Sequence, residues 1–486
     1  MGVIALCLYL AVMLLLMLRG RQASTESSFF VNNRSSGAVG VGLAIMAACV
    51  GASATMGMIG MAFSLGTPAF WWLGMGAVGL LFAGIFLAGK VRGTCAVTLP
   101  QIVEKFLGAP ARPVVSAVIV CAWLAILAAQ FSAIRQIVTS LTAMPPAISF
   151  CISLLLIMGH TLGGGQAAVM RMGGIQAAII FGGLAVTLGW LTRLNPLWLS
   201  FVVIEPVNAQ FPLSELARYG LIVGGSYLVC PMLFGRFLSA RDSKTAQRGG
   251  ILAAGGLICA AALMVAIGLA CRGILPPETP ADAVLTTALM TVLPEWVHIL
   301  ILVALLSAVI SSADACLITA GTVLSRDLLQ KKSRAACRVS MALLGCIGAG
   351  VSCLDKTILG FLLMSYDVYV CGVVIPVLIA LIAGPNYRVA PRLACAAVFI
   401  GGVFGGISSL GGNAAWSYAG LAASFALTSV GLRKKSERNN IRNNRNLCRG
   451  GQYALPVRKI CVRIAKLVYL PHRFRQKQLQ KGDYGK

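Results

Sequence analysis

The feature that most constrains this chain is a series of apolar runs, each long enough to cross a lipid bilayer. A spanning helix needs about 20 apolar residues, because each residue adds about 1.5 Å across a hydrocarbon core about 30 Å thick. In lipid every backbone polar group must be satisfied within the chain, so the runs predict an all-α polytopic membrane protein. We expect about thirteen spans, at residues 2–18, 37–64, 68–89, 113–140, 146–162, 174–192, 215–235, 249–271, 292–325, 336–354, 357–384, 393–411 and 414–431.

Composition indicates the same class. Only 11% of the 486 residues are charged, against about 25% in soluble domains. The first run is followed by the basic residues of "RGR" rather than by a small-residue cleavage site, so we expect it to be retained as a span. The sixteen cysteines include no CxxC pair, which argues against a metal site or a disulfide framework.

Lysine and arginine are unevenly divided between the segments that connect the spans. If the N-terminus lies outside, the outer loops carry only Arg193, Arg218, Arg272 and Lys356. Cytoplasmic loops of membrane proteins carry the excess of positive charge. The sequence therefore predicts a multi-pass protein of the cell (inner or plasma) membrane, with its N-terminus outside and its C-terminus in the cytoplasm.

The formal net charge of +26 is concentrated at the C-terminal end of the chain. Residues 433–486 hold 16 basic and 2 acidic residues, which leaves +12 for the rest. A basic segment next to the membrane is attracted to anionic lipid. We expect this partner for the tail, and we do not expect nucleic acid.

Two spans contain residues that interrupt helices. The second, "AACVGASATMGMIGMAFSLG", is rich in glycine, and the seventh, "LIVGGSYLVCPMLFGRF", places Gly224, Gly225 and then Pro231 in a short run. Interrupted helices in equivalent positions of two halves mark the binding sites of many transporters. These spans lie five apart, which predicts inverted five-helix repeats formed by spans 2–6 and 7–11. Close helix packing is the alternative explanation of the glycines.

A polar cluster lies in the ninth span, within "LLSAVISSADACLITAGTVLSRDLLQ". Ala308, Ser311 and Ser312 share one helical face, and hydroxyls joined by free carbonyls of a broken helix make an oxygen cage for a hard monovalent cation. The alternative is that the hydroxyls bond to their own helix or to a neighbour. Asp314 follows, and a carboxylate near mid-bilayer costs about 2.5–3.5 kcal/mol. Asp367 is a second acid within a span, with either a structural or a functional role.

Five stretches, in this order, resemble the sodium/solute symporter family, which includes the sodium/proline and sodium/galactose transporters. They are "ESSFFVNNRSS", "VGASATMGMIGMAFSLGTPAFWWLG", "GKVRGTCAVTLPQIVEKFLG", "GGSYLVCPMLFGRFLSARDSKTA" and "SAVISSADACLITAGTVLSRDLLQ". The resemblance implies a five-plus-five inverted-repeat core (spans 2–11), preceded by one helix and followed by two. The expected division is a leading helix and loop at 1–36, the core at 37–384, the trailing helices at 385–432 and the tail at 433–486.

The resemblance also implies a sodium site between the second and ninth spans. Carried over residue by residue, its ligands are carbonyls of the second span, a carbonyl of the ninth and two hydroxyls of the ninth. These residues are Ala52, Thr55, Ala308, Ser311 and Ser312.

One stretch departs from the family pattern. Family members often carry "AVxxTDxxQ" in the sixth span, whereas this chain has "AVMRMGGIQ", with Met172 and Gly173 in place of Thr and Asp. In the family that acid lies on the cytoplasmic ion path or at a second sodium site. We hypothesise that the acid has moved to the ninth span as Asp314, where it would serve a second cation or a proton.

The expected function is sodium-coupled symport of a small organic solute by alternating access, with Na⁺ as coupling ion and no organic cofactor. The solute is expected between the interrupted spans, near Met56, Met61, Tyr227 and Cys230. Proton coupling through Asp314 is one alternative, and a transporter-like sensor that signals through the tail is another. The three histidines are scattered without a nucleophile–base arrangement, so we do not expect an enzyme.

Overall fold

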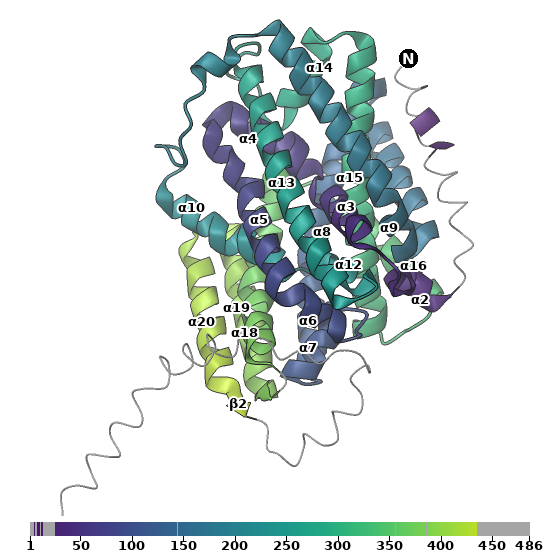
Figure 1. The fold of residues 1–486 in the computed structure, drawn as a ribbon, viewed down its shortest axis with the longest axis vertical. Coiled ribbons are helices and arrows are strands. Elements are labelled where there is room, and N and C mark those ends of the chain that lie inside the picture. The colour runs from purple at the N-terminus through teal and green to yellow at the C-terminus, as the bar shows by residue number, and fades with distance from the viewer. Residues whose placement is uncertain are drawn as a thin grey trace, which may run out of the picture.

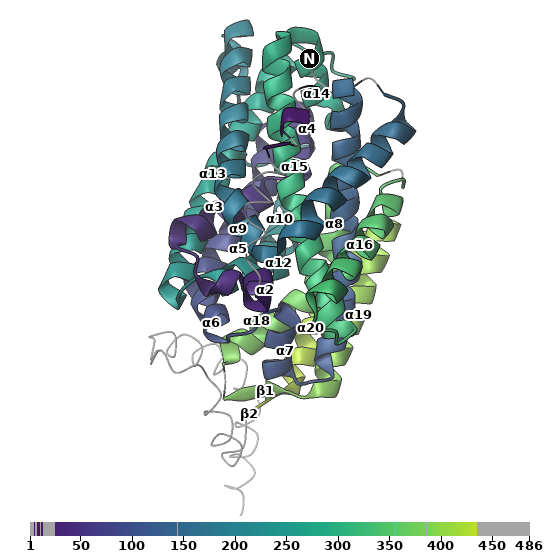
Figure 2. The ribbon, with the colours of Figure 1, turned by 90° about the vertical axis from the view of Figure 1, so that its right-hand side faces the viewer.

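The computed structural model describes residues 4, 7–9, 11–12, 25–142, 144–354, 356–384 and 386–434. Over these residues the chain is a bundle of long helices with one two-stranded sheet (Figures 1 and 2). Most of the expected first span, and the tail beyond residue 434, lie outside the described residues. The predictions made for these segments, including lipid binding by the tail, stay predictions.

The helices follow the predicted spans closely. In chain order they are α2 (Glu26–Val31), α3 (Ala38–Cys49), α4 (Met58–Leu65), α5 (Phe70–Phe82), α6 (Ala88–Gly93), α7 (Leu99–Leu107), α8 (Ala111–Thr142), α9 (Pro146–Leu194), α10 (Leu213–Tyr219), α11 (Gly225–Leu228), α12 (Pro231–Ser239), α13 (Ser243–Arg272), α14 (Val284–Val292), α15 (Glu295–Val323), α16 (Arg334–Val351), α17 (Ile358–Tyr369), α18 (Ile375–Ala383), α19 (Pro391–Gly411) and α20 (Ala415–Gly431). Short π-helical turns lie at Ser53–Gly57, Ala83–Leu87, Gly220–Gly224, Leu324–Leu328 and Val370–Val374.

Among the described residues, nine helical segments are long and apolar enough to span a membrane, or ten if the bent pair α3–α4 is one span. The all-α polytopic class is therefore confirmed, whereas the count of thirteen is not. The most enclosed of these segments contains α15, with 83% of its apolar window buried. The polar cluster of the ninth span thus lies inside the bundle.

The second span is interrupted, as its glycines predict. α3 ends at Cys49, and Val50 leaves the helical region with φ −88° and ψ 68°. The chain then resumes a helical course, bent by 62° from α3. The bend frees backbone groups on both sides of Gly51.

The seventh span is interrupted at Val229 and Cys230, which are both extended, and α12 starts at Pro231. Proline disfavours the helical region for the residue before it, which explains the position of this break. The glycine pair 224–225, in contrast, remains helical. The proline therefore marks the interruption more closely than the glycines do.

The fifth and sixth spans form a single element, α9, kinked at Gly165. The connection between the two spans is shorter than the predicted bounds of 162 and 174 imply, because most of those residues are helical and the break lies at the non-helical Gly165. Gly165 has φ +62°, and a Cβ there would lie 2.5 Å from Cδ2 of Phe29. Only glycine fits this positive-φ, closely packed position, so the chain turns there between two helical segments of α9.

The connecting segments are sorted between the two ends of the bundle. Figures 1 and 2 place α4 and α14 at one end and α6, α7 and β2 (Leu432–Lys434) at the other. β2 pairs antiparallel with β1 (Tyr387–Val389), a small exception to the all-helical expectation. The basic segments of α6, α7 and β1 thus share an end, as the predicted topology requires. Which membrane face this end meets stays a prediction.

Candidate functional site

The hydroxyls of Ser311 and Ser312 on α15 reach the last turn of α3. The Ser311 hydroxyl oxygen lies 2.7 Å from the carbonyl oxygens of both Ala47 and Ala308, so its single proton serves both acceptors. The Ser312 hydroxyl donates to the Ala48 carbonyl at 2.7 Å. Both serines are buried. The pair therefore bonds to a neighbouring helix at the point where that helix breaks.

The break explains why these two carbonyls need partners. In a continuous helix the carbonyls of residues 47 and 48 would accept from the amides of residues 51 and 52. The bend at Val50 removes these bonds, and a buried carbonyl without a partner is costly. Ser311 and Ser312 supply the replacement donors. Across the break, the Ala52 N–H donates to Oε1 of Gln130 on α8, at 3.2 Å.

Of the residues predicted as a sodium site, Ser311 bonds to Ala308, whereas Ala52 and Thr55 lie beyond the break, and among the described residues their carbonyls accept from neither serine hydroxyl. The Thr55 hydroxyl donates to the Gly51 carbonyl at 2.9 Å and lies 3.4 Å from the Ala52 carbonyl oxygen. On α3 the serine hydroxyls bond to the carbonyls of Ala47 and Ala48, which precede the predicted ligands Ala52 and Thr55 in the chain. The Ser311 hydroxyl also bonds to the Ala308 carbonyl of its own helix. Hydroxyl and carbonyl oxygens are the neutral, hard donors that suit a sodium ion.

Gly51 lies directly beside side chains of both α15 and α8. A Cβ on Gly51 would lie 2.2 Å from the Ser312 hydroxyl oxygen and 3.2 Å from Oε1 of Gln130. The absence of a side chain therefore lets α15 and α8 reach the broken backbone together.

Asp314 lies one turn further along α15. The Thr161 hydroxyl of α9 donates to its carboxylate at 2.5 Å, and both residues are buried. Gly173, where family members often carry the acid, packs directly against α3: a Cβ there would lie 2.6 Å from Cα of Ala44. A carboxylate at residue 173 would displace α3, which fits the departure seen in the sequence.

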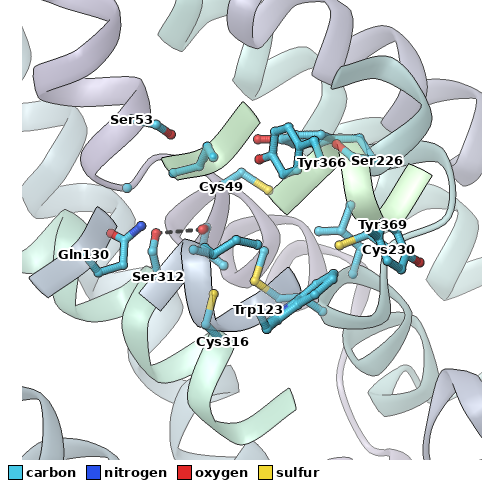
Figure 3. Close-up of a pocket in the computed structure, with 17 residues that line it drawn as sticks. Cys49, Ser53, Trp123, Gln130, Ser226, Cys230, Ser312, Cys316, Tyr366 and Tyr369 are labelled. Atoms are coloured by element: carbon cyan, nitrogen blue, oxygen red, sulfur yellow. Dashed lines mark hydrogen bonds between the residues drawn. The ribbon is translucent and has the colours of Figure 1, made fainter. Parts of the chain in front are cut away.

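A small cavity of about 50 Å³ adjoins the break (Figure 3). Gly51 and Ser312 line it, so the candidate ion site borders it directly. Tyr227 and Cys230, predicted to contact the solute, also line it. Met56 and Met61 are buried in the surrounding core and are not lining residues.

Several lining residues were missed by the sequence reasoning. They are Cys49, Trp123, Gln130, Cys316, Tyr366 and Tyr369. Tyr369 donates its hydroxyl to the Val229 carbonyl at 2.7 Å, which satisfies an acceptor freed by the second interruption. Isolated aromatic, thiol and amide side chains are common in apolar spans, so no spacing pattern could have singled these out.

The residues that line the cavity carry no formal charge. None of them is Asp, Glu, Lys, Arg or His. Polar contacts are available from the Gln130 amide, the hydroxyls of Ser53 and Ser226, and the tyrosines. The cavity therefore offers hydrogen bonds and aromatic surface to a ligand but no fixed charge.

Comparison with known proteins agrees with this geometry. The sequence pattern of the sodium:solute symporter family matches residues 29–195 and 203–348. The chain is 24% identical over 339 residues to the sodium/pantothenate symporter of Haemophilus influenzae, covering 64% of this chain and 68% of that protein. It is 24% identical over 326 residues to the human high affinity choline transporter 1, covering 60% of this chain and 55% of that protein.

Two solved structures share the fold. A Na⁺-coupled sialic acid symporter, substrate-bound and outward-open, matches with a TM-score of 0.74 and 14% identity, covering 89% of this chain and 99% of that one. A transporter of the nucleobase-cation-symport-1 family, in a closed conformation, matches with a TM-score of 0.58 and 12% identity, covering 82% and 92%. The family pattern covers more than half of the chain, so this protein belongs to the sodium:solute symporter family and couples solute movement to sodium by alternating access.

Proposed function

We propose that this protein carries a small organic solute together with sodium, and that the ion binds where α15 meets the broken α3–α4 pair. The main support for this proposal is that the Ser311 and Ser312 hydroxyls donate to the carbonyls of Ala47 and Ala48, which the break leaves without helical donors. Ala52, Thr55 and Ala308 complete the proposed set of oxygen ligands.

Sodium would act by replacing hydrogen bonds with ion–oxygen contacts. Each serine hydroxyl now uses its proton on an α3 or α15 carbonyl. When the ion binds, the hydroxyl oxygens and nearby carbonyls face it instead, and the ion holds α15 against the break. Because Gly51 and Ser312 also line the cavity, a bound ion fixes part of the solute site, and each ligand raises the affinity of the other equally.

Asp314 is proposed to serve a second cation or a proton. Its carboxylate is buried and accepts a hydrogen bond from Thr161, so it adds negative charge beside the ion path. Coupling to protons through Asp314 is the competing function. The two are separated by asking which gradient drives transport.

The solute is proposed to bind through hydrogen bonds and aromatic contacts, because the residues lining the cavity carry no charge. The named relatives carry pantothenate and choline, and these two compounds belong first in a screen. Neutral sugars and zwitterionic amino acids follow.

The test is uptake into proteoliposomes that hold the purified protein. An inward sodium gradient should drive accumulation of one radiolabelled compound of the screen above its external concentration, and a sodium ionophore should abolish it. A pH gradient without sodium should drive none. Accumulation that follows the pH gradient and ignores sodium would overturn the proposal in favour of proton coupling.

A further inference from the structure

Gln130 lies on α8 between the broken backbone and the solute cavity. Its side chain is buried, with 2% of its surface exposed. The Oε1 atom accepts the Ala52 N–H at 3.2 Å, so Gln130 compensates for the break on its amide side as the serines do on its carbonyl side. Side chains of α8 and α15 therefore both bond to the backbone of the α3–α4 pair at its break.

The orientation of the Gln130 amide follows from this contact. Since a backbone N–H can only donate, the atom facing Ala52 is the amide oxygen, and the NH₂ group lies on the other branch. Gln130 lines the cavity, and Figure 3 shows its amide beside the Ser312 hydroxyl. The NH₂ group thus offers donors where a solute oxygen could accept.

We infer that Gln130 is a positioning residue that couples the solute cavity to the ion site. This inference rests on the proposed function. A solute oxygen that accepts from the Gln130 NH₂ group would fix the amide, and the amide oxygen would then hold Ala52, whose carbonyl is a proposed ion ligand. The same contacts carry the effect of sodium to the cavity, as reciprocal coupling requires.

Gln130→Met and Gln130→Glu separate this role from simple packing. Methionine has similar length but no oxygen to accept the Ala52 N–H, whereas a glutamate oxygen can still accept it. Gln101→Met is the matched control: the Gln101 side chain also accepts a backbone N–H, that of Val97 at 3.0 Å, but it lies on α7, outside the cavity.

The first readout is binding of radiolabelled sodium to purified protein. Gln130→Met should raise the dissociation constant about tenfold, Gln130→Glu, which keeps an acceptor for the Ala52 N–H, should bind sodium more tightly than Gln130→Met, and Gln101→Met should stay within about threefold of wild type. If wild type binds no sodium, the proposed function fails. If wild type binds sodium and Gln130→Met binds it equally well, only the role of Gln130 fails.

The second readout reports on the cavity without any solute. Cys49, Cys230 and Cys316 line it, and mass spectrometry can follow their alkylation by N-ethylmaleimide one residue at a time. Saturating sodium should change their alkylation rate at least threefold in wild type and Gln130→Glu, and should leave it unchanged in Gln130→Met. A sodium effect that persists in Gln130→Met, or is missing from wild type, would overturn the inference. Gln130→Asn, too short to reach Ala52, serves as the second variant if methionine prevents folding.

Discussion

At the scale of single residues, Gly51 is a position with no room for a side chain. A Cβ there would lie 2.2 Å from the Ser312 hydroxyl oxygen, so Gly51→Ala must push α15 or Gln130 away from the break. We predict that sodium affinity falls at least tenfold, measured with radiolabelled sodium. Gly40→Ala, in α3 before the break and with nothing within 4 Å of its Cβ, should bind like wild type. Equal affinity of the two variants would show that the close approach is not needed for the ion.

Asp314 carries the second residue-scale prediction. Asp314→Asn removes the negative charge but keeps an oxygen that can accept from Thr161, so the fold should survive. If the acid has moved here from the sixth span, the sodium concentration for half-maximal transport should rise about tenfold. Thr319→Val, which changes a hydroxyl of α15 that among the described residues bonds to its own helix at Ala315, is the control. Unchanged sodium activation in Asp314→Asn would rule out the hypothesis.

The sequence could identify some of these residues and not others. Adjacent serines and an aspartate stand out in an apolar span, because polar groups there need partners. Gln130 did not stand out, since one amide in a span has many possible partners and its contact with Ala52 depends on how α8 packs. The α3 carbonyls that the serines use depend on the position of the break, which sequence pattern alone does not give to the residue.

At the scale of elements, the two interrupted helices depend on side chains from other helices. Tyr369 of α17 is fully buried and donates to the Val229 carbonyl at the second break. Tyr369→Phe leaves this carbonyl without its donor, at a cost of about 1–3 kcal/mol. We predict a lower melting temperature for the purified protein. Tyr387→Phe, at a tyrosine 39% exposed on β1, should melt like wild type. An equal fall in melting temperature in both variants would contradict the stabilising role of the Tyr369 hydrogen bond.

Proline and glycine differed in how well they predicted element boundaries. Pro231 begins α12, because proline fixes its own φ and restricts the residue before it. Gly165 was overlooked, because one glycine in a glycine-rich stretch does not show which residue will adopt a positive φ. Its kink depends on the approach of Phe29, which lies far away in the sequence. Local chemistry predicted the first feature, and tertiary packing decided the second.

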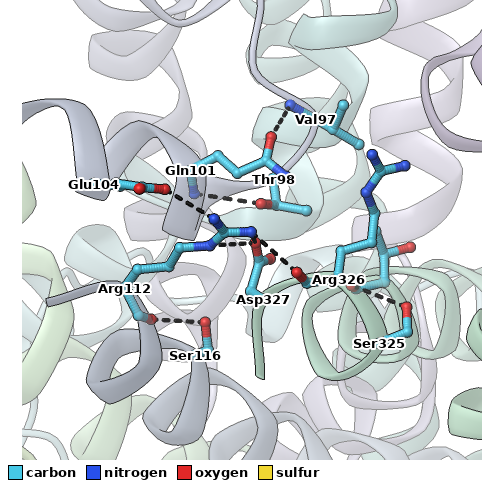
Figure 4. Close-up of polar contacts among 10 residues, drawn as sticks. Val97, Thr98, Gln101, Glu104, Arg112, Ser116, Ser325, Arg326 and Asp327 are labelled. Carbon is cyan, nitrogen blue, oxygen red and sulfur yellow. Dashed lines mark hydrogen bonds and ion pairs between the residues drawn. The ribbon is translucent and has the colours of Figure 1, made fainter. Parts of the chain in front are cut away.

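At the scale of the whole molecule, an ion-pair cluster joins α7, α8 and the end of α15 (Figure 4). Arg112 contacts Asp327 at 2.7 Å and Glu104 at 2.9 Å, and it donates to the Arg326 carbonyl at 3.0 Å. The Asp327 side chain has no exposed surface. The cluster therefore ties the helix that carries the serines to α8, which carries Gln130.

Arg112→Met should destabilise the protein, because it leaves the buried Asp327 carboxylate without its ion-pair partner. Loss of one partner from a buried pair costs about 3 kcal/mol, which thermal unfolding in detergent would detect. Arg241→Met is the matched control, since Arg241 and Asp242 form an exposed pair, with side chains 69% and 53% accessible. Exposed pairs contribute about 0–1 kcal/mol. Similar losses in the two variants would show that the cluster does not hold the helices together.

Hydropathy predicted the helical bundle, because a membrane restricts the possible folds severely, and glycine and proline predicted its interrupted spans. Hydropathy did not predict that α3, α8 and α15 meet at one break, since that depends on packing between distant parts of the chain. Other features depend only on residues that are close together in the sequence. At the start of α13 the Asp242 carboxylate accepts the Thr245 N–H at 2.8 Å, and this hydrogen bond lowers the pKa of Asp242.

The most direct test is equilibrium binding of radiolabelled sodium to purified wild type and to the double variant Ser311→Ala/Ser312→Ala. This measurement needs no knowledge of the solute. Wild type should bind sodium saturably, and the double variant, folded and monodisperse, should lose that binding, while Thr319→Val on the same helix keeps it. Undiminished binding in the double variant, or none in folded wild type across a range of pH, would contradict a sodium site at the junction of α15 with the broken second span.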